Sequence, residues 1–170
     1  MREKDLNALV LECLSELKDQ DIAPGEVSEW KVNKRAGTRW GRCIRNADET
    51  FTIEIAQRLL TDERISDKAC KETIIHELLH TCKGCMKHTG SWKMYATQMN
   101  VAYGYNIKRT TSGSEKGVED HEVTPLPVKH IFVCKNCGAV IYRKRESRFT
   151  RHYRRYACAR CKASAWSKIK

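Results

Sequence analysis

The sequence predicts an α+β domain followed by a small ribbon held by four cysteines. Apolar residues recur at helical spacing over about residues 3–19, whereas they alternate with polar residues over 50–56. Two Cys-x2-Cys pairs, separated by 20 residues, lie near the C-terminus. We therefore divide the 170 residues into a domain over 1–109, a linker over 110–127 and a cysteine-rich module over 128–170.

The first domain combines helices with a small sheet. After the N-terminal helix, Pro24-Gly25 ends the helical pattern. Three strands are expected over 27–33, 38–45 and 50–56, and we expect them to form an antiparallel sheet. Two further helices are predicted over 66–82 and 91–102. Cys13, Cys43 and Cys70 fall within apolar patterns and are interpreted as core residues.

The linker and the module are distinguished by composition. Residues 110–127 are polar and contain Gly, Ser and Pro, which is typical of a connecting segment. In the module, the short apolar stretches 131–133 and 139–142 each lie beside a cysteine pair. We interpret them as strands of a compact β-rich ribbon.

Overall composition restricts the class of protein. Apolar residues make up 41% and charged residues 31%, which is typical of a globular chain. No run approaches the roughly 18 apolar residues that a membrane span needs, and Met1–Asp5 does not begin a secretion signal. We therefore expect a cytoplasmic protein without a membrane partner. Because that compartment is reducing, the nine cysteines favour metal binding over disulfides.

The segment His76-Glu77-Leu78-Leu79-His80 predicts a metal site. Residues four apart on a helix project from one face, so the two imidazoles can share one ion. Glu77 lies beside that ion, where it can act as a general base toward a metal-activated water. Catalytic zinc sites usually have three protein ligands and one open position.

His88 is our candidate for the third ligand. It lies too far from His80 for an unbroken helix to place both on one face, so the chain must turn, and Gly84 permits that turn. A glutamate from the next helix is the common alternative, but residues 91–102 contain no acidic side chain. For Cys82 and Cys85 the sequence leaves open a redox pair, competition for the metal, or a purely structural role.

The four C-terminal cysteines predict a second, structural zinc site. Cys134, Cys137, Cys158 and Cys161 have the spacing of a two-knuckle ribbon, in which four thiolates close the coordination sphere. A module of about 40 residues has too little core to fold by itself, and a metal supplies the missing stability. The sequence therefore predicts two zinc ions per chain, one catalytic and one structural.

The module also carries the whole positive excess of the chain. Residues 128–170 contain 13 Lys and Arg against the single acid Glu146, whereas 1–127 contain 19 basic and 20 acidic residues. Such asymmetry favours nucleic-acid binding over a merely solvated surface. The candidate contacts lie between the two cysteine pairs, and they are Arg143, Lys144, Arg145, Arg148, Arg151, Arg154, Arg155 and the aromatic Tyr153.

The order of these features resembles the SprT-like metallopeptidases, which include the Spartan proteases. The resemblance spans roughly residues 5–165 and is carried by the HELLH helix, the His88…Trp92-Lys93 segment and the cysteine pairs. It implies a small zincin-type fold over 1–109, zinc ligation by His76, His80 and His88, and catalysis by Glu77. Some members of the family are DNA-dependent proteases that degrade proteins crosslinked to DNA.

The resemblance therefore implies a zinc metalloendopeptidase with a protein substrate and DNA as partner, active in DNA repair and associated with DNA or the nucleoid. Two alternatives stay open: a non-enzymatic DNA-binding zinc protein, and a regulatory protease that needs no DNA. Besides a metal ion, Tyr95, Tyr103 and Arg39 are candidates for stabilising an oxyanion. The sequence leaves open the physiological substrate, the preferred form of DNA, the oligomeric state and the regulation.

Overall fold

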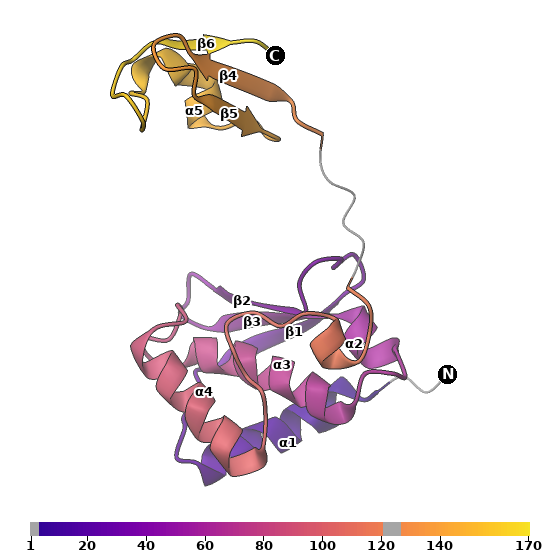
Figure 1. The fold of residues 1–170 in the computed structure, drawn as a ribbon. Coiled ribbons are helices and arrows are strands. Elements are labelled where there is room, and N and C mark those ends of the chain that lie inside the picture. The colour runs from indigo at the N-terminus through magenta and orange to yellow at the C-terminus, as the bar shows by residue number, and fades with distance from the viewer. Residues whose placement is uncertain (1–3, 121–126) are drawn as a thin grey trace. The chain divides into compact units, whose positions relative to one another are not determined.

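A computed structural model of the chain describes residues 4–120 and 127–170 (Figure 1). The chain divides into two units, Met1–Val123 and Thr124–Lys170, each with its own hydrophobic core. The first unit mixes helices and strands, and the second contains a four-cysteine cluster near the C-terminus. These features confirm the α+β class and the cysteine-rich module that the sequence predicts.

The elements of the first unit follow the predicted order. They are α1 (Leu6–Asp19), β1 (Val27–Asn33), β2 (Gly41–Arg45), β3 (Phe51–Ala56), α2 (Gln57–Thr61), α3 (Asp67–Thr81), α4 (Gly90–Tyr103) and the 3₁₀ turn η1 (Ser114–Lys116). Asp5 caps α1 by accepting from the N–H groups of Asn7 and Ala8, and Ser66 caps α3 by accepting from that of Ala69. The short α2 and η1 were not predicted.

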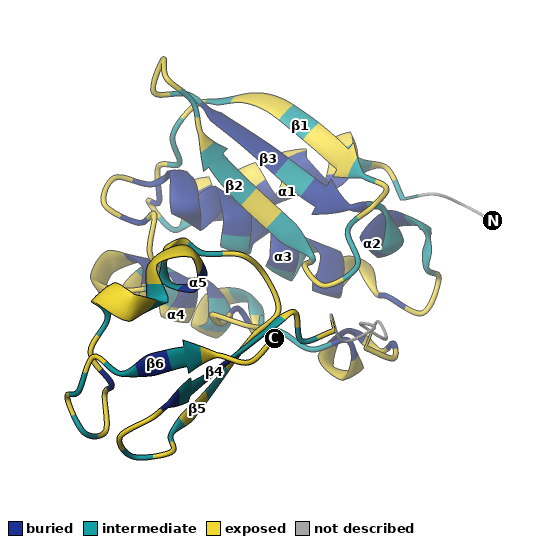
Figure 2. Ribbon diagram, turned by 90° about the horizontal axis from the view of Figure 1, so that it is seen from above, coloured by how far each residue is buried: buried dark blue, intermediate teal, exposed yellow. Residues whose placement is uncertain are grey.

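The expectation of an antiparallel sheet is wrong for one of its two strand pairs. The strand order is β1-β3-β2, with β2 antiparallel to β3 but β1 parallel to it. The loop 34–40 carries the chain from one edge of the sheet to the other, so β3 lies in the middle. In Figure 2, β3 is almost entirely buried, whereas β1 and β2 are partly exposed. The physical reason for the order is that the most apolar strand lies in the middle of the sheet, where both of its edges are paired.

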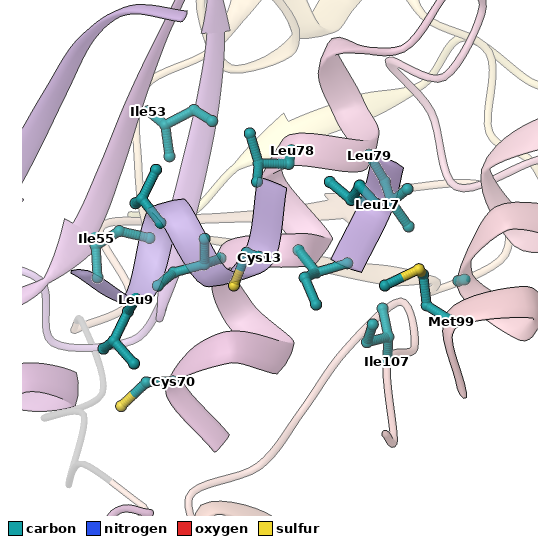
Figure 3. Packing of buried hydrophobic residues seen from close by; sticks show 14 of the residues in the cluster. Leu9, Cys13, Leu17, Ile53, Ile55, Cys70, Leu78, Leu79, Met99 and Ile107 are labelled. Carbon is teal, nitrogen blue, oxygen red and sulfur yellow. The ribbon is translucent and has the colours of Figure 1, made fainter. Parts of the chain in front are cut away.

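The helices α1, α3 and α4 lie on one face of this sheet (Figure 1). Between sheet and helices lies the core, to which α1 contributes Leu9, Cys13 and Leu17, and β3 contributes Ile53 and Ile55 (Figure 3). α3 is central to this core, because most of its residues after Lys68 are buried. Cys13 and Cys70 are fully buried, as predicted, and Cys43 is half-buried against the same core.

Residues 110–120, which the sequence assigns to a linker, are packed on the first unit. The indole N–H of Trp40 donates to the carbonyl of Thr111 at 3.2 Å, and Val118 is only 5% exposed. Lys116 is buried against α3. The first unit therefore extends past residue 109, while residues 121–126 lie outside the described part of the chain.

The second unit is a three-stranded antiparallel ribbon of order β5-β4-β6. Its elements are β4 (His130–Cys134), β5 (Val140–Arg143), α5 (Arg148–His152), the 3₁₀ turn η2 (Tyr153–Arg155) and β6 (Trp166–Lys168). Phe132 and Trp166 form its small core together with two of the cysteines. Such a small core agrees with a fold that needs a metal for stability.

Candidate metal centre

Three imidazole rings converge at the C-terminal half of α3. His76 and His80 project from one face of this helix, which ends at Thr81. Gly84 turns the chain with φ +78°, and His88 then brings its Nε2 to 2.9 Å from Nε2 of His76 and 3.1 Å from that of His80. The structure thus brings together the three histidines that the sequence predicts.

The surroundings keep these rings in the form that binds a metal. Nδ1 of His80 lies 2.8 Å from the carbonyl oxygen of Cys85, which can only accept, so Nδ1 carries the hydrogen and Nε2 presents its lone pair. Burial, together with the neighbouring rings of His80 and His88, lowers the pKa of His76 to about 3. Burial likewise lowers the pKa of His80 and of His88. All three rings are therefore neutral near pH 7.

Trp92 of α4 closes one side of the cluster. Its side chain is 2% exposed, and its ring centroid lies 4.8 Å from that of His76, 5.6 Å from that of His80 and 4.6 Å from that of His88. This packing fixes the ring planes of all three imidazoles. In the sequence Trp92 belongs to the segment that carries the family resemblance, but the spacing of residues gives no sign of this contact.

The donor set fits a zinc ion. Three imidazole nitrogens with one open position are the usual ligands of a catalytic zinc, and Zn–N bonds of about 2.0–2.1 Å place such nitrogens roughly 3.3 Å apart. The two Nε2 separations here, 2.9 and 3.1 Å, are a few tenths of an ångström shorter. The ligand atoms of all three rings lie within 4.8 Å of one another.

The side chain of Glu77, a residue of α3, packs against Gly41 at the start of β2. It is 6% exposed, and burial raises the pKa of its carboxyl to about 8, opposed by a hydrogen bond from the backbone N–H of Cys43 and by the charge of Arg39. A carboxyl with this pKa exchanges a proton readily near neutral pH. Its position one residue after His76 follows from the sequence, whereas its contact with β2 does not.

Gly41 makes room for that carboxyl. A Cβ atom at position 41 would lie 2.6 Å from Oε1, 2.7 Å from Cγ and 2.9 Å from Cδ of Glu77. These distances are far below ordinary van der Waals contact, so a larger residue would displace the Glu77 side chain. Gly41 is therefore part of the site, although a single glycine in a predicted strand carries no such signal in the sequence.

A cavity of about 240 Å³ opens beside His76 and Glu77. It is also lined by residues 38–41, which lead into β2, by Glu72 and Thr73 of α3, and by the segment 106–111 with Lys116. Of the three side chains considered as oxyanion stabilisers, Arg39 lines this cavity. Tyr103 does not line it, because its hydroxyl donates to the carbonyl of Glu16 and its ring stacks on Tyr105.

Cys82 and Cys85 do not join the imidazole cluster. Among the described residues, the groups that could hold a metal are the three histidines and the four ribbon cysteines. Both thiols are buried, and burial raises the pKa of Cys82 to about 11 and that of Cys85 above its usual value. The protonated thiols favour the structural interpretation, in which Cys85 serves the site through its backbone carbonyl.

The four ribbon cysteines form the second cluster. Sγ of Cys134 lies 3.6 Å from that of Cys161, and Sγ of Cys137 lies 3.7 Å from that of Cys158. In a tetrahedral zinc site with Zn–S bonds of about 2.3 Å, neighbouring sulfurs lie roughly 3.8 Å apart. The four thiols are therefore spaced for one zinc ion with no open position.

The basic residues of the ribbon are exposed around α5 and η2. All seven of the predicted cationic contacts are exposed, and no ion pair found within residues 4–120 and 127–170 involves any of them. Tyr153 is half-buried, and the centroid of its ring lies 5.0 Å from that of Phe132. Phe149 and Tyr156 also pack on the ribbon core. These aromatics therefore contribute to the packing of the module.

Comparison with known families places the chain among its relatives. Residues 8–112, more than half of the chain, match the SprT-like family. Comparisons with curated proteins and with solved structures gave no match. No helix within the described ranges is long and apolar enough to cross a membrane. The matched stretch contains the three histidines, Glu77 and Gly41, and the chain therefore belongs to the SprT-like family.

Proposed function

We propose that the first unit is a zincin-type metallopeptidase that hydrolyses peptide bonds in proteins. The convergence of three neutral imidazoles beside the buried carboxyl of Glu77 is the observation that carries this proposal. His76, His80 and His88 would hold the zinc ion. Membership of the SprT-like family, which is a family of metallopeptidase-like domains, supports the same assignment.

The chemistry divides between the metal and Glu77. His76, His80 and His88 would hold a zinc ion, which would supply Lewis-acid chemistry toward the scissile carbonyl and toward water. Glu77 accepts a proton from the attacking water and later delivers it to the leaving amine. Burial of Glu77 and the narrow space left by Gly41 hold the carboxyl in position for both transfers.

The edge of β2 offers a place for the substrate backbone. β3 is paired on both sides, whereas β2 lies at an edge of the sheet. Gly41 at the start of this strand lies against Glu77, since a Cβ there would be 2.6 Å from Oε1 of that carboxyl. An extended peptide that pairs with β2 would therefore pass beside Glu77, and its main chain would be held by strand addition.

We further propose that the ribbon binds DNA and brings the protease to DNA-associated or DNA-crosslinked proteins. Seven exposed Lys and Arg side chains in one short segment can pair with phosphates, and their binding would release counterions. The four cysteines would hold a second, structural zinc. This charge favours a DNA-dependent protease over a protease that acts without DNA.

A cleavage assay separates the proposed function from its alternatives. A DNA-binding protein is incubated with the purified zinc-loaded chain, alone and with single-stranded or duplex DNA, and the products are identified by mass spectrometry. We expect DNA-stimulated cleavage that is lost in Glu77→Gln, while the metal content stays at two zinc ions per chain. Equal cleavage by Glu77→Gln would refute catalysis by this residue. A cleavage rate that does not change when DNA is added would favour the regulatory protease. If the protein binds DNA but cleaves nothing, the non-enzymatic DNA-binding protein is favoured.

A further inference from the structure

Lys116 is buried in the cavity next to His76 and Glu77, where the proposed reaction has no use for it. The residue lies in η1, within a polar segment, yet it is only 4% exposed. Burying an ammonium group is costly unless the charge is paired. The cost shows in its titration, because burial lowers the pKa of Lys116.

The contacts of Lys116 leave most of its binding capacity free. Nζ donates to the carbonyl of Ala69 at 2.9 Å and lies 5.8 Å from the centroid of the Trp40 ring. An ammonium group has three N–H donors, and neither contact neutralises the charge. The carboxylates of Glu72 and Glu115 raise the pKa of Lys116, but by less than burial lowers it. None of the ion pairs in the described part of the chain includes Lys116.

A purely structural tether does not explain this lysine. One hydrogen bond to Ala69 ties η1 to α3, but a neutral side chain could make such a contact without the cost of a buried charge. A buried cation on the wall of an accessible cavity is, in contrast, a ready partner for a carboxylate. Charge-assisted hydrogen bonds of that kind are about twice as strong as neutral ones.

Two of the other cations of the cavity are paired with carboxylates. Arg39 pairs with Glu54 at 3.3 Å, and Lys108 pairs with Glu115. On the acidic side, Glu72 accepts the backbone N–H of Asn106 at 2.9 Å. Of the remaining cations that line the cavity, Arg109 is exposed, so Lys116 provides the buried positive charge that a ligand would meet.

We infer that this cavity is a substrate subsite that selects an aspartate or glutamate side chain close to the scissile bond. The inference rests on the proposed peptidase function. A volume of about 240 Å³ is smaller than the roughly 300–1,000 Å³ of sites for drug-sized ligands, and it suits one side chain. Because His76 and Glu77 share the same walls, the selected residue lies next to the reacting carbonyl.

The test begins with the wild-type protein and its cleavage sites. Zinc-loaded chain is given an unfolded protein substrate with DNA, and the cut positions are mapped by mass spectrometry. Peptides around one cut are then made with acetylated and amidated ends, so that the side chain is the only carboxylate at the tested position. We expect kcat/KM for glutamate to exceed that for glutamine at least tenfold. Replacement of Lys116 by methionine should reduce this ratio to about one.

A matched control and the wild-type ratio keep the result interpretable. Lys18→Met removes an exposed lysine of α1, away from the cavity, and should retain the preference. Equal rates for the glutamate and glutamine peptides in the wild-type protein would overturn the subsite while leaving the peptidase intact, and so would an unchanged ratio in Lys116→Met. If Lys116→Met does not fold, the wild-type ratio and the mapped cuts decide. Absence of any cleavage would remove the proposed function, and this subsite with it.

Discussion

Replacing Gly41 by alanine would place a methyl group where the side chain of Glu77 now lies. The new Cβ would start 2.6 Å from Oε1, whereas ordinary contact begins at 3.4 Å, so the carboxyl must retreat by about 0.8 Å. Glu77 cannot move freely, because it is 6% exposed and packed between α3 and β2. The substitution therefore perturbs the proposed base without touching a metal ligand.

The expected magnitudes follow from this overlap. A misplacement of about 1 Å in a catalytic group can cost roughly 100-fold in rate, so we expect kcat to fall by about that factor. Overpacking a buried site typically costs about 1–3 kcal/mol. Zinc binding at His76, His80 and His88 should be retained, because the three atoms nearest to a Cβ at position 41 all belong to Glu77 and not to these rings.

A double-mutant cycle identifies the contact. Glu77→Ala removes the side chain that the new methyl group would strike, so Gly41→Ala should cost little stability in that background. Denaturant unfolding of the four proteins gives the coupling free energy, which we expect to recover most of the 1–3 kcal/mol. Arg45→Ala, an exposed change in the same strand, serves as control and should leave both activity and stability near wild type.

Two results would refute this reasoning. If Gly41→Ala cleaves substrate at the wild-type rate, Glu77 either tolerates the displacement or is not the base. If Gly41→Ala costs the same stability with and without the Glu77 side chain, the overlap with the carboxyl is not what position 41 avoids. The zinc content of the same samples shows whether any loss of activity comes from displacement of the Glu77 carboxyl or from loss of the metal.

Further predictions concern the metal sites and the ribbon. Chelation of zinc should unfold the ribbon while the first unit keeps its own core, and limited proteolysis that cuts both units alike would contradict this. Replacing Arg151, Arg154 and Arg155 by glutamine should reduce the slope of log K against log salt for duplex DNA by about 2.7, and an unchanged slope would exclude these contacts. Trp92→Ala should lower the free energy of unfolding by about 3–5 kcal/mol and weaken zinc binding. If calorimetry gives the same zinc affinity for the variant and the wild type, the packing of Trp92 does not position the imidazoles.

The sequence by itself determined the features that depend on local geometry. An α-helix repeats every 3.6 residues, so two histidines four apart must share a face wherever the helix packs, and α3 confirms this placement. The turn within each Cys-x2-Cys pair also depends on local geometry. N–H groups of Gly138 and Lys162 donate back to the carbonyls of Cys134 and Cys158 at 2.8 Å, so each cysteine pair shapes its own turn.

Only the tertiary structure decided which distant segments meet. Alternation of apolar residues predicts a strand but does not indicate which strand it pairs with or in which direction. The parallel pairing of β1 with β3 was therefore not predicted. Gly41 and Glu77 are separated by 36 residues, and Lys116 reaches the same cavity from a segment that reads as a linker. Such contacts depend on how buried surfaces of the whole unit fit together, because side-chain packing is not encoded in the spacing of any one segment.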